Sequence, residues 1–483
     1  MKLLHRFFYS SSIALLLLPQ CSFAQSSDEK HIAAIEANLS PNMVKAGEPI
    51  HGKSLTEAMA DYHVPAVSIA IIRHGKIAWS RSFGTLSIGG PPVTADTLFQ
   101  AGSISKPIAA TAALHLVQQG KLSLDGDVNS FLTDWKLPPS SKAEGKVVTL
   151  RELLSHTAGT NVHGFPGYAA GDSVPTILQV LDGTPPATNS PVRVESVPGK
   201  QWDYSGGGYV IVQQMIVDAT GKPFTEVLRD TVLRPYRMTH SSFQQPLSPD
   251  ALRNAAMPYQ ADGTPIAGGP HTYPELTAAG LWTTATDLAR FLLFTQKALL
   301  RGNSVLSAST AQQMVTPGLG NWGLGLEIGG RPGHRYFWHG GGNAGYQCIM
   351  TAYEGQSDGA VVMTNGNRGY PLANDIIRSI AREYNWPDWG PRVVHVVPVD
   401  PAILQQYTGK YKMNDWFSFD VTFHDNKLFI QGTGQPNLEM WPESDTRFTF
   451  VVDVDVEFLR SSNGKIIGMN VLQDGKTIPA TKQ

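Results

Sequence analysis

Short apolar runs near both ends of the first 385 residues predict paired β-strands. Residues 66–73 are apolar and β-branched, residues 77–83 alternate between apolar and polar positions, and a glycine-containing turn separates the two runs. Strands joined by so short a turn pair antiparallel, which is not how a doubly wound nucleotide-binding domain begins. Two later runs, 348–353 and 360–364, flank a polar turn. We expect the early and late strands to meet in one antiparallel sheet.

Helical patterns fill the middle of this region. Residues 103–119 are rich in alanine and apolar on nearly every side, so this helix is expected in the interior. Thr284 and Asp287 form a capping-box pattern at the start of another helix. Shorter helices are predicted at 149–154, 209–219 and 372–384. Residues 160–200 are rich in Gly, Pro and Ser, which predicts a long irregular insertion.

The composition is that of a globular protein large enough for two or three domains. The chain has 483 residues, of which 42% are hydrophobic and 16% charged, and its formal net charge is −2. This balance gives no electrostatic basis for binding nucleic acid or an anionic membrane surface. We therefore expect neither partner.

The first 24 residues have the pattern of a secretory signal peptide. Lys2 and Arg6 precede an apolar stretch at 13–18, and residues 22–24 are of the kind that a signal peptidase recognises. The mature protein is expected to begin near Gln25 and to be periplasmic or secreted. No later segment reaches 18 consecutive apolar residues, so we expect no transmembrane segment.

Two cysteines bear on anchoring and stability. Cys21 could receive a lipid in a bacterial lipoprotein, but Gln20 stands where such signals carry a small residue, so this alternative is less favoured. Cys348 is then the only cysteine of the mature chain, which excludes an intrachain disulfide. Its apolar neighbours favour a buried core residue over a nucleophile.

The chain divides into four parts on this evidence. A signal peptide at 1–24 precedes a domain at 25–386. Residues 387–401 carry several prolines and are interpreted as a stiff linker. Residues 402–483 contain short alternating runs, with turn signals at Asn463-Gly464 and Asp474-Gly475, and predict a small all-β domain.

A search for a serine nucleophile first excludes one familiar arrangement. The one Gly-x-Ser-x-Gly sequence of the chain, at 355–359, forms the polar turn between two predicted strands rather than a strand-to-helix elbow, which weighs against an α/β-hydrolase. The pattern Ser-x-x-Lys occurs three times, beginning at Ser27, Ser103 and Ser462. Ser27 lies in the polar leader and Ser462 overlaps a predicted turn, so only Ser103 opens a buried helix.

The spacing of Ser103 and Lys106 suits nucleophilic catalysis. Residues three apart lie on one face of a helix, one turn from each other. A lysine in an apolar surrounding favours its neutral form, which can accept a proton from the serine hydroxyl. The start of the helix also directs backbone N–H groups at developing negative charge. The alternative, that Ser103 only caps the helix and Lys106 is solvated, stays open on the pattern alone.

Two further segments contribute polar groups. Tyr204 lies in a polar loop at 198–206, before the helix at 209–219, and could offer its phenol to the site. His339 is followed by Gly340, Gly341 and Gly342, and glycines after a strand let a substrate lie against the backbone.

Together these segments resemble the serine β-lactamase-related family, which includes class C β-lactamases, D-alanyl-D-alanine carboxypeptidases and esterases of the same fold. The matching motifs, in chain order, are Ser103-Ile104-Ser105-Lys106, Tyr204-Ser205-Gly206 and His339-Gly340-Gly341. The resemblance covers about residues 50 to 385. It implies an α+β fold of the β-lactamase/transpeptidase type, with an antiparallel sheet, flanking helices and a helical subdomain. The all-β tail resembles the lipocalin-like appendage of some members.

The resemblance also implies a role for each motif. Ser103 would be acylated, and Lys106 and Tyr204 would share proton transfer, with the identity of the base left open. His339 would orient the proton network or a substrate carboxylate. The backbone N–H groups of Ser103 and Gly342 would form the oxyanion hole. No metal or organic cofactor is implied.

Substrate contacts are expected from three more residues, Gly206, Gly341 and Asn343. Gly206 departs from the family pattern, because an asparagine that bonds the substrate amide usually stands there, and Asn343 could compensate. His339 departs from the lysine of class C β-lactamases. Both departures favour ester or D-amino-acid peptide substrates over β-lactams.

The leading hypothesis is therefore a secreted or periplasmic serine acyl hydrolase, working on small esters or D-amino-acid peptides through an acyl-serine intermediate. The alternatives are a β-lactamase, or a non-catalytic receptor for penicillin or cell-wall fragments. A scaffold or adhesion protein acting through the all-β tail is a third hypothesis. The oligomeric state and the role of that tail stay open.

Overall fold

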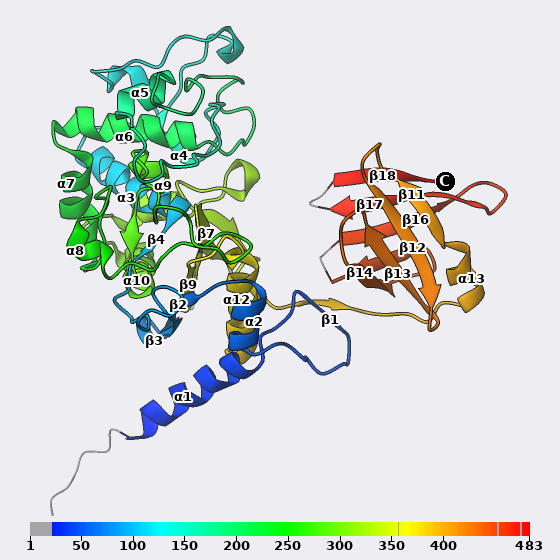
Figure 1. Ribbon diagram of the computed structural model, residues 1–483. Coiled ribbons are helices and arrows are strands. Elements are labelled where there is room, and N and C mark those ends of the chain that lie inside the picture. The colour runs from blue at the N-terminus through cyan, green and yellow to red at the C-terminus, as the bar shows by residue number, and fades with distance from the viewer. Residues whose placement is uncertain (1–21, 356, 452–453, 474–475) are drawn as a thin grey trace, which may run out of the picture.

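A computed structural model describes residues 22–355, 357–451, 454–473 and 476–483. Figure 1 shows an N-terminal α+β domain and a separate C-terminal β-barrel. The first 21 residues of the expected signal peptide, including Cys21, lie outside the described residues. Helix α1 (Ser22–Ala37) begins within the expected cleavage region.

One six-stranded antiparallel sheet organises the N-terminal domain, in the order β3-β2-β9-β8-β7-β6. The early hairpin joins the late strands where Ile69 of β2 pairs with Val362 of β9. This confirms the single antiparallel sheet that the sequence predicts. The strands are β2 (Ala66–Arg73), β3 (Lys76–Gly84), β6 (Glu327–Gly329), β7 (Tyr336–Asn343), β8 (Tyr346–Tyr353) and β9 (Gly359–Thr364).

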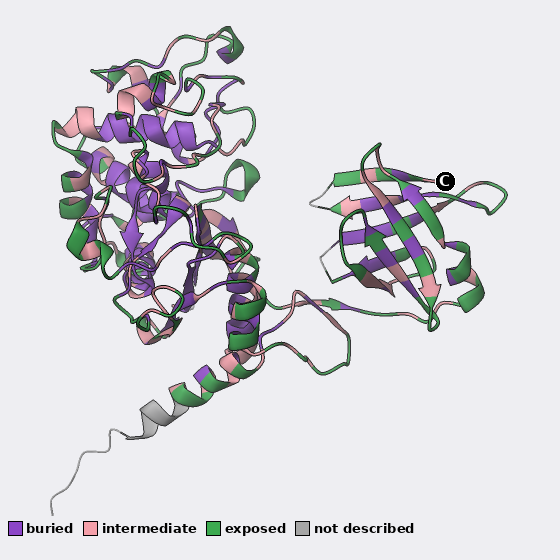
Figure 2. Ribbon diagram, viewed as in Figure 1, coloured by how far each residue is buried: buried purple, intermediate pink, exposed green. Residues whose placement is uncertain are grey.

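Helices cover both faces of this sheet, which is why β2 is apolar throughout. Because side chains alternate along a strand, Ile69 and Ile71 join one core with Ile376 of α12 (Gly369–Glu383). Ala70 joins the other core with α10 (Ala285–Arg301). Helices α1 and α2 (Leu55–Asp61) pack beside α12. Figure 2 shows the buried residues concentrated in the sheet and in the helices behind it.

A helical region completes the domain. Its longest helices, α3 (Ser105–Gln118) and α6 (Gly206–Thr220), are both mostly buried. The shorter ones are α4 (Leu150–Leu154), α5 (Ile177–Asp182), α7 (Phe224–Leu228), α8 (Pro249–Leu252), α9 (Leu276–Ala279) and α11 (Ala308–Met314). Two short strands, β4 (Phe99–Gln100) and β5 (Trp282–Thr283), pair antiparallel. The helices expected from the sequence are present, and α5 is a helix within the insertion at 160–200 that was expected to be irregular.

Two helix starts differ from the sequence-based expectation. Helix α6 begins at Gly206, three residues early, because the Ser205 hydroxyl accepts the Gly208 N–H at 2.9 Å and caps it. At α10 the Thr284 hydroxyl accepts the Asp287 N–H and caps the helix as predicted. The Asp287 carboxylate, however, does not accept the Thr284 N–H, so the capping box is incomplete. It accepts instead from the backbone N–H of His240 and the hydroxyl of Ser241.

The C-terminal domain is a closed antiparallel barrel of strands β11 to β18. The register Tyr411↔Lys482 between β11 and β18 closes it. Its strands are β11 (Gly409–Lys412), β12 (Ser418–His424), β13 (Lys427–Gly432), β14 (Asn437–Pro442), β15 (Arg447–Phe450), β16 (Val454–Arg460), β17 (Ile466–Gln473) and β18 (Lys476–Lys482). This confirms a small all-β domain. The Asn463-Gly464 turn joins β16 to β17 as expected, whereas Asp474-Gly475 lies outside the described residues.

The segment between the domains is more ordered than a stiff linker. Strand β10 (Arg392–Val394) pairs in parallel with β1 (Met43–Lys45) from the N-terminal region. This two-stranded ribbon contacts the barrel through ion pairs from Lys45 to Glu439 at 3.1 Å and from Arg392 to Asp455 at 2.8 Å. Helix α13 (Pro401–Gln406) then leads into β11. In the part of the chain that the structure describes, no helix is long and apolar enough to span a membrane.

Candidate active site

The structure brings Ser103 and Lys106 into contact. Ser103 lies in a 3₁₀ turn (Gly102–Ile104) that leads directly into α3, and it stays partly exposed. The Nζ atom of Lys106 lies 2.9 Å from the Ser103 hydroxyl and 2.9 Å from the carbonyl oxygen of Ala278 in α9. A nucleophile and a proton acceptor are therefore within hydrogen-bond distance.

Burial prepares Lys106 to act as a base. Its side chain is 2% exposed, and the rings of Tyr204 and Tyr209 lie 5.0 and 5.6 Å from Nζ. Desolvation disfavours the charged form and lowers the pKa of Lys106 to about 7. An appreciable fraction of the amine is thus neutral near pH 7 and can accept the proton of Ser103.

Tyr204 approaches the same hydroxyl from the loop before α6. Burial raises the pKa of the Tyr204 phenol far above its usual value, and a hydrogen bond with Ser103 only partly opposes this. The phenol therefore stays protonated near neutral pH and is placed to donate a proton rather than to accept one. This geometry favours Lys106 as the base.

His156 holds the Tyr204 loop in position. Its Nδ1 accepts the backbone N–H of Ser205 at 3.1 Å, and its ring stacks on Tyr204 with centroids 4.2 Å apart. Since Nδ1 accepts, the proton of the neutral ring is on Nε2, which is buried without a partner among the described residues. The sequence favours a loop-fixing role for His156 over a catalytic one, because single histidines are usually structural, and this contact agrees with that role.

His339 on β7 forms a third side of the site. Its Nδ1 lies 2.5 Å from the carbonyl oxygen of Gly340, so Nδ1 carries the proton and Nε2 is an acceptor. Burial, and then the charge of Lys106, lowers the pKa of His339 to about 3. The ring is neutral at physiological pH and supplies no positive charge. Trp322, which sequence analysis missed, packs edge-on against it with centroids 5.5 Å apart.

The register of β7 directs the Gly342 N–H toward the cleft. Asn343 and Tyr346 close a two-residue turn and form a hydrogen-bonded pair, so the next pair, Gly342↔Gln347, is not hydrogen-bonded. The N–H of Gly342 therefore points away from β8. It lies on the same side as the Ser103 turn, because a Cβ on Gly102 would meet the Gly342 nitrogen at 2.5 Å.

Gly341 and Asn343 hold this strand close to the nucleophile. A Cβ on Gly341 would lie 1.9 Å from the Ala101 carbonyl oxygen, so only glycine permits the approach. The amide nitrogen of Asn343 donates to Gln100 at 2.6 Å and to the Ala279 carbonyl at 3.0 Å. Both of its hydrogens are engaged, so Asn343 braces β7 and has no donor left for a substrate.

Gly206 lies beside Phe165, a residue that the sequence does not indicate as part of the site. A Cβ placed on Gly206 would lie 3.0 Å from Cε2 of Phe165. Phe165 comes from the insertion at 160–200, whose irregular sequence gives no sign of which part returns to the site.

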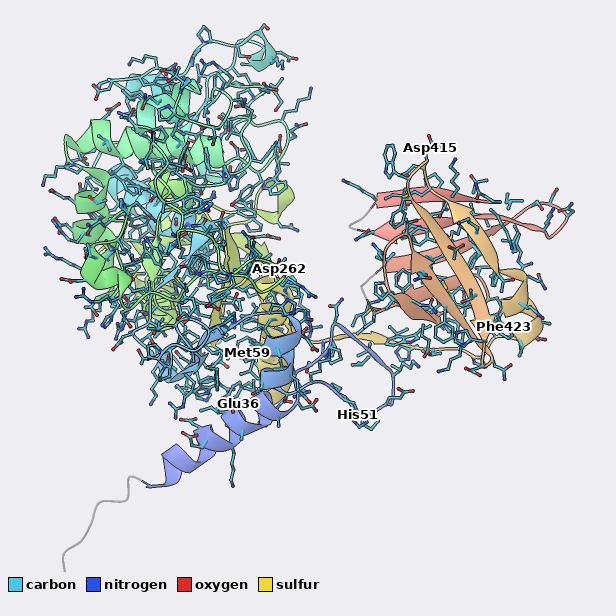
Figure 3. The ribbon with its side chains drawn as sticks, in the orientation of Figure 1. Glu36, His51, Met59, Asp262, Asp415 and Phe423 are labelled. Carbon is cyan, nitrogen blue, oxygen red and sulfur yellow. The ribbon has the colours of Figure 1, made fainter. Side chains whose placement is uncertain are left out.

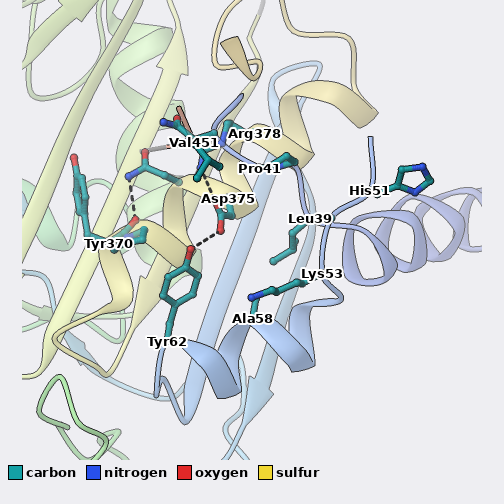
Figure 4. Close-up of a pocket in the computed structure, with 14 residues that line it drawn as sticks. Leu39, Pro41, His51, Lys53, Ala58, Tyr62, Tyr370, Asp375, Arg378 and Val451 are labelled. Carbon is teal, nitrogen blue, oxygen red and sulfur yellow. Dashed lines mark hydrogen bonds and ion pairs between the residues drawn. The ribbon is translucent and has the colours of Figure 1, made fainter. Parts of the chain in front are cut away.

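A cavity elsewhere in the molecule is a weaker candidate for the active site. It has a volume of about 720 Å³ and is lined by α2, α12, residues 39–53 and Val451 (Figure 4). Three of its polar side chains bond one another, since Tyr62 donates to Asp375 at 3.1 Å and Arg378 pairs with the same carboxylate. It contains no nucleophile paired with a base.

The fold and these contacts place a serine hydroxyl beside a buried lysine, and comparisons with known proteins show the family of the chain. The family model "Beta-lactamase" matches residues 53–384. The chain therefore belongs to the β-lactamase family, whose members are mostly serine hydrolases. A second model, a domain of unknown function named DUF3471, matches residues 395–480.

Individual proteins match most of the chain. Penicillin-binding protein 4* of Bacillus subtilis (strain 168) is 24% identical over 443 residues, which cover 86% of this chain and 94% of the relative. The octameric penicillin-binding protein homologue from Pyrococcus abyssi matches with a TM-score of 0.60 and 22% identity, covering 89% and 97% of the two chains. The D-alanine carboxypeptidase AmpC from Burkholderia cenocepacia matches with a TM-score of 0.54 and 20% identity, covering 72% and 99%.

Proposed function

We propose that the protein is a secreted or periplasmic serine acyl hydrolase that forms an acyl-Ser103 intermediate. The observation that carries the proposal is the 2.9 Å contact between the Ser103 hydroxyl and a buried Lys106 whose pKa is lowered to about 7. Membership of the β-lactamase family supports the acyl-transfer chemistry. The signal-like N-terminus and the likeness to penicillin-binding proteins support the location.

The geometry supports the following acylation step. Neutral Lys106 accepts the proton of Ser103 as Oγ forms a bond with the substrate carbonyl carbon. The backbone N–H groups of Ser103 and Gly342 stabilise the oxyanion; removing one such donor typically costs about 100- to 1,000-fold in rate. As the carbonyl reforms, the bond to the leaving oxygen or nitrogen breaks and Tyr204 donates a proton to it. Transfer from Lys106 to Tyr204 restores the phenol.

Deacylation uses the same groups in reverse roles. A water molecule takes the place of the departed leaving group, and neutral Lys106 accepts its proton. The water oxygen attacks the acyl carbon, and the ester bond to Ser103 breaks as its oxygen recovers a proton. The products are a carboxylic acid and the free serine.

Three features favour ester substrates over D-peptides and β-lactams. His339 is neutral and offers no ion pair to a terminal carboxylate. Gly206 provides no side chain to bond a substrate amide, and the donors of Asn343 are already engaged. A buried polar group of the substrate left without a partner costs about 1 to 3 kcal/mol. A D-amino-acid peptidase is the second candidate, favoured by the likeness of the chain to penicillin-binding proteins.

Turnover of three substrate classes tests the proposal. We expect p-nitrophenyl esters to be hydrolysed faster than D-Ala-D-Ala peptides and nitrocefin. Ser103→Ala is expected to remove all three activities while keeping the fold, with Ser27→Ala as the matched control that keeps them. Full ester turnover in folded Ser103→Ala would exclude the assignment. Permanent labelling of Ser103 by penicillin without any turnover would support a receptor instead.

A further inference from the structure

The side chain at position 206 would point to the same side of the chain as Tyr204. Ser205, between them, is extended, with φ −132° and ψ 118°. Side chains alternate along an extended segment, so residues 204 and 206 share one side. The Ser205 hydroxyl takes the opposite side, where it donates to the Asn161 carbonyl at 2.7 Å. Because Tyr204 reaches Ser103, the space beside Gly206 faces the reaction centre.

Phe165 occupies this space. Its Cε2 and Cδ2 atoms lie 3.0 and 3.5 Å from the position of a Cβ on Gly206. The ring is partly exposed and packs against the large hydrophobic core of the domain. The wall that the cleft presents beside Tyr204 is thus mainly aromatic, and the backbone carbonyl oxygen of His163 lies 3.3 Å from the same Cβ position.

The loop that carries Phe165 is held at both ends. On one side, the Gly207 N–H donates to the Val162 carbonyl at 2.8 Å, and His163 Nδ1 lies 2.5 Å from the Tyr204 carbonyl oxygen. The ring position is therefore tied directly to the catalytic loop.

The other end of the loop is tied to the strand that bears the oxyanion donor. The Tyr273 hydroxyl donates to the Pro166 carbonyl at 3.2 Å and accepts the Ala344 N–H at 2.9 Å. Ala344 follows β7 directly. Phe165 consequently lies between the Tyr204 loop and the turn beyond Gly342.

We propose that Phe165 determines acyl-group specificity by forming the apolar wall of the acyl subsite, so that the protein prefers esters with a flat apolar acyl group. This inference rests on the proposed acyl hydrolase function. An aromatic ring packs favourably on another ring, whereas an acetyl group leaves the wall uncovered. A polar acylamino group that packs on the ring would lose hydrogen bonds to water that the ring cannot replace.

Competing p-nitrophenyl esters of one leaving group test the subsite directly. The full-length protein is expected to hydrolyse the phenylacetate ester with a kcat/KM at least about tenfold above that of the acetate ester. Phe165→Ala is expected to reduce this ratio about tenfold, and Phe165→Leu, which keeps apolar bulk, about two- to threefold. Phe423→Ala on the barrel, which Figure 3 places away from the N-terminal domain, is the matched control and should leave the ratio unchanged.

The outcomes distinguish a failure of the Phe165 subsite from a failure of the proposed acyl hydrolase function. If Ser103→Ala abolishes ester turnover but both Phe165 variants keep the wild-type ratio, the subsite is wrong and the hydrolase assignment stands. If Phe165→Ala does not fold, an unchanged ratio in Phe165→Leu alone overturns the subsite. If the folded wild-type protein hydrolyses neither ester, both proposals fail together.

Discussion

We expect the protonation of Lys106 to set the working pH of the site. Because the pKa of this buried amine is lowered to about 7, it is charged and inactive as a base below pH 7 and neutral above it. We expect kcat/KM for an ester to rise about tenfold per pH unit between pH 5 and 6.5 and to level off above about pH 7.5. Initial rates between pH 5 and 9 measure this profile. A plateau already present at pH 5 would contradict Lys106 as the base.

A second buried titratable residue, Glu275, makes stability depend on pH. Its side chain is fully buried, neither carboxyl oxygen has a side-chain partner among the described residues, and burial raises its pKa from 4.5 to about 7. The unfolded chain therefore releases this proton more readily, and stability is lost as pH rises from about 4.5 to 7.

Replacing Glu275 with an uncharged residue removes this loss. We expect Glu275→Gln to stabilise the fold at pH 8 by up to about 3 kcal/mol and to change little at pH 4. Thermal unfolding at the two pH values measures the difference. Glu144→Gln, at an exposed position, is the control. An equal effect of Glu275→Gln at both pH values would show that the carboxyl group is not responsible.

Single residues could be predicted from sequence where the chemistry is local. The Ser103–Lys106 spacing within one helical turn predicted both the contact and the desolvation of the lysine. Trp322 and Phe165 could not be found in this way, because they reach the site through irregular segments. Asn343 matched an expected substrate contact, yet its amide hydrogens bind Gln100 and α9, a competition that sequence does not show.

At the scale of elements, the site depends on how closely β7 approaches the turn before α3. A Cβ on Gly341 would lie 1.9 Å from backbone, whereas one on Gly340 would meet only the Tyr370 ring at 3.2 Å, which can shift. We expect Gly341→Ala to move the Gly342 donor and to reduce kcat about 100-fold. Gly340→Ala should cost less than about tenfold.

Steady-state kinetics and circular dichroism of the two glycine variants check this expectation. Equal losses in both variants would contradict a special role for the close approach at Gly341.

Strands were predictable from the sequence where the pairing partner is close in the chain, as in the β2–β3 hairpin. Strands β14 and β18 escaped prediction because Pro442 and Pro479 and many polar positions obscure their alternation.

At the scale of the whole molecule, the β1–β10 ribbon joins the barrel to the catalytic domain. Arg392 contacts both Glu443 and Asp455 of the barrel, at 3.0 and 2.8 Å. We expect Arg392→Ala to loosen this attachment and to speed proteolytic cleavage near residues 395–400, while kcat/KM for small esters stays within about twofold.

The order in this segment was not predictable, because β10 exists only through pairing with a strand some 350 residues earlier.

Limited proteolysis beside ester kinetics provides the measurement. Arg253→Ala, which removes an exposed pair with Asp250, is the control and should change neither quantity. If loss of the Arg392 contacts abolished small-ester turnover with the N-terminal domain still folded, the barrel would be part of the catalytic unit. That result would contradict a catalytic site built by the N-terminal domain alone.

The central claim is that Ser103 carries the acyl group during turnover, and trapping that intermediate tests it most directly. The protein is mixed with p-nitrophenyl phenylacetate, quenched in acid within one turnover, digested and analysed by mass spectrometry. The account predicts a phenylacetyl group on the peptide containing Ser103, and its absence in Ser103→Ala. A stable acyl group on another residue, or rapid turnover with no covalent adduct on Ser103 at any quench time, would contradict it.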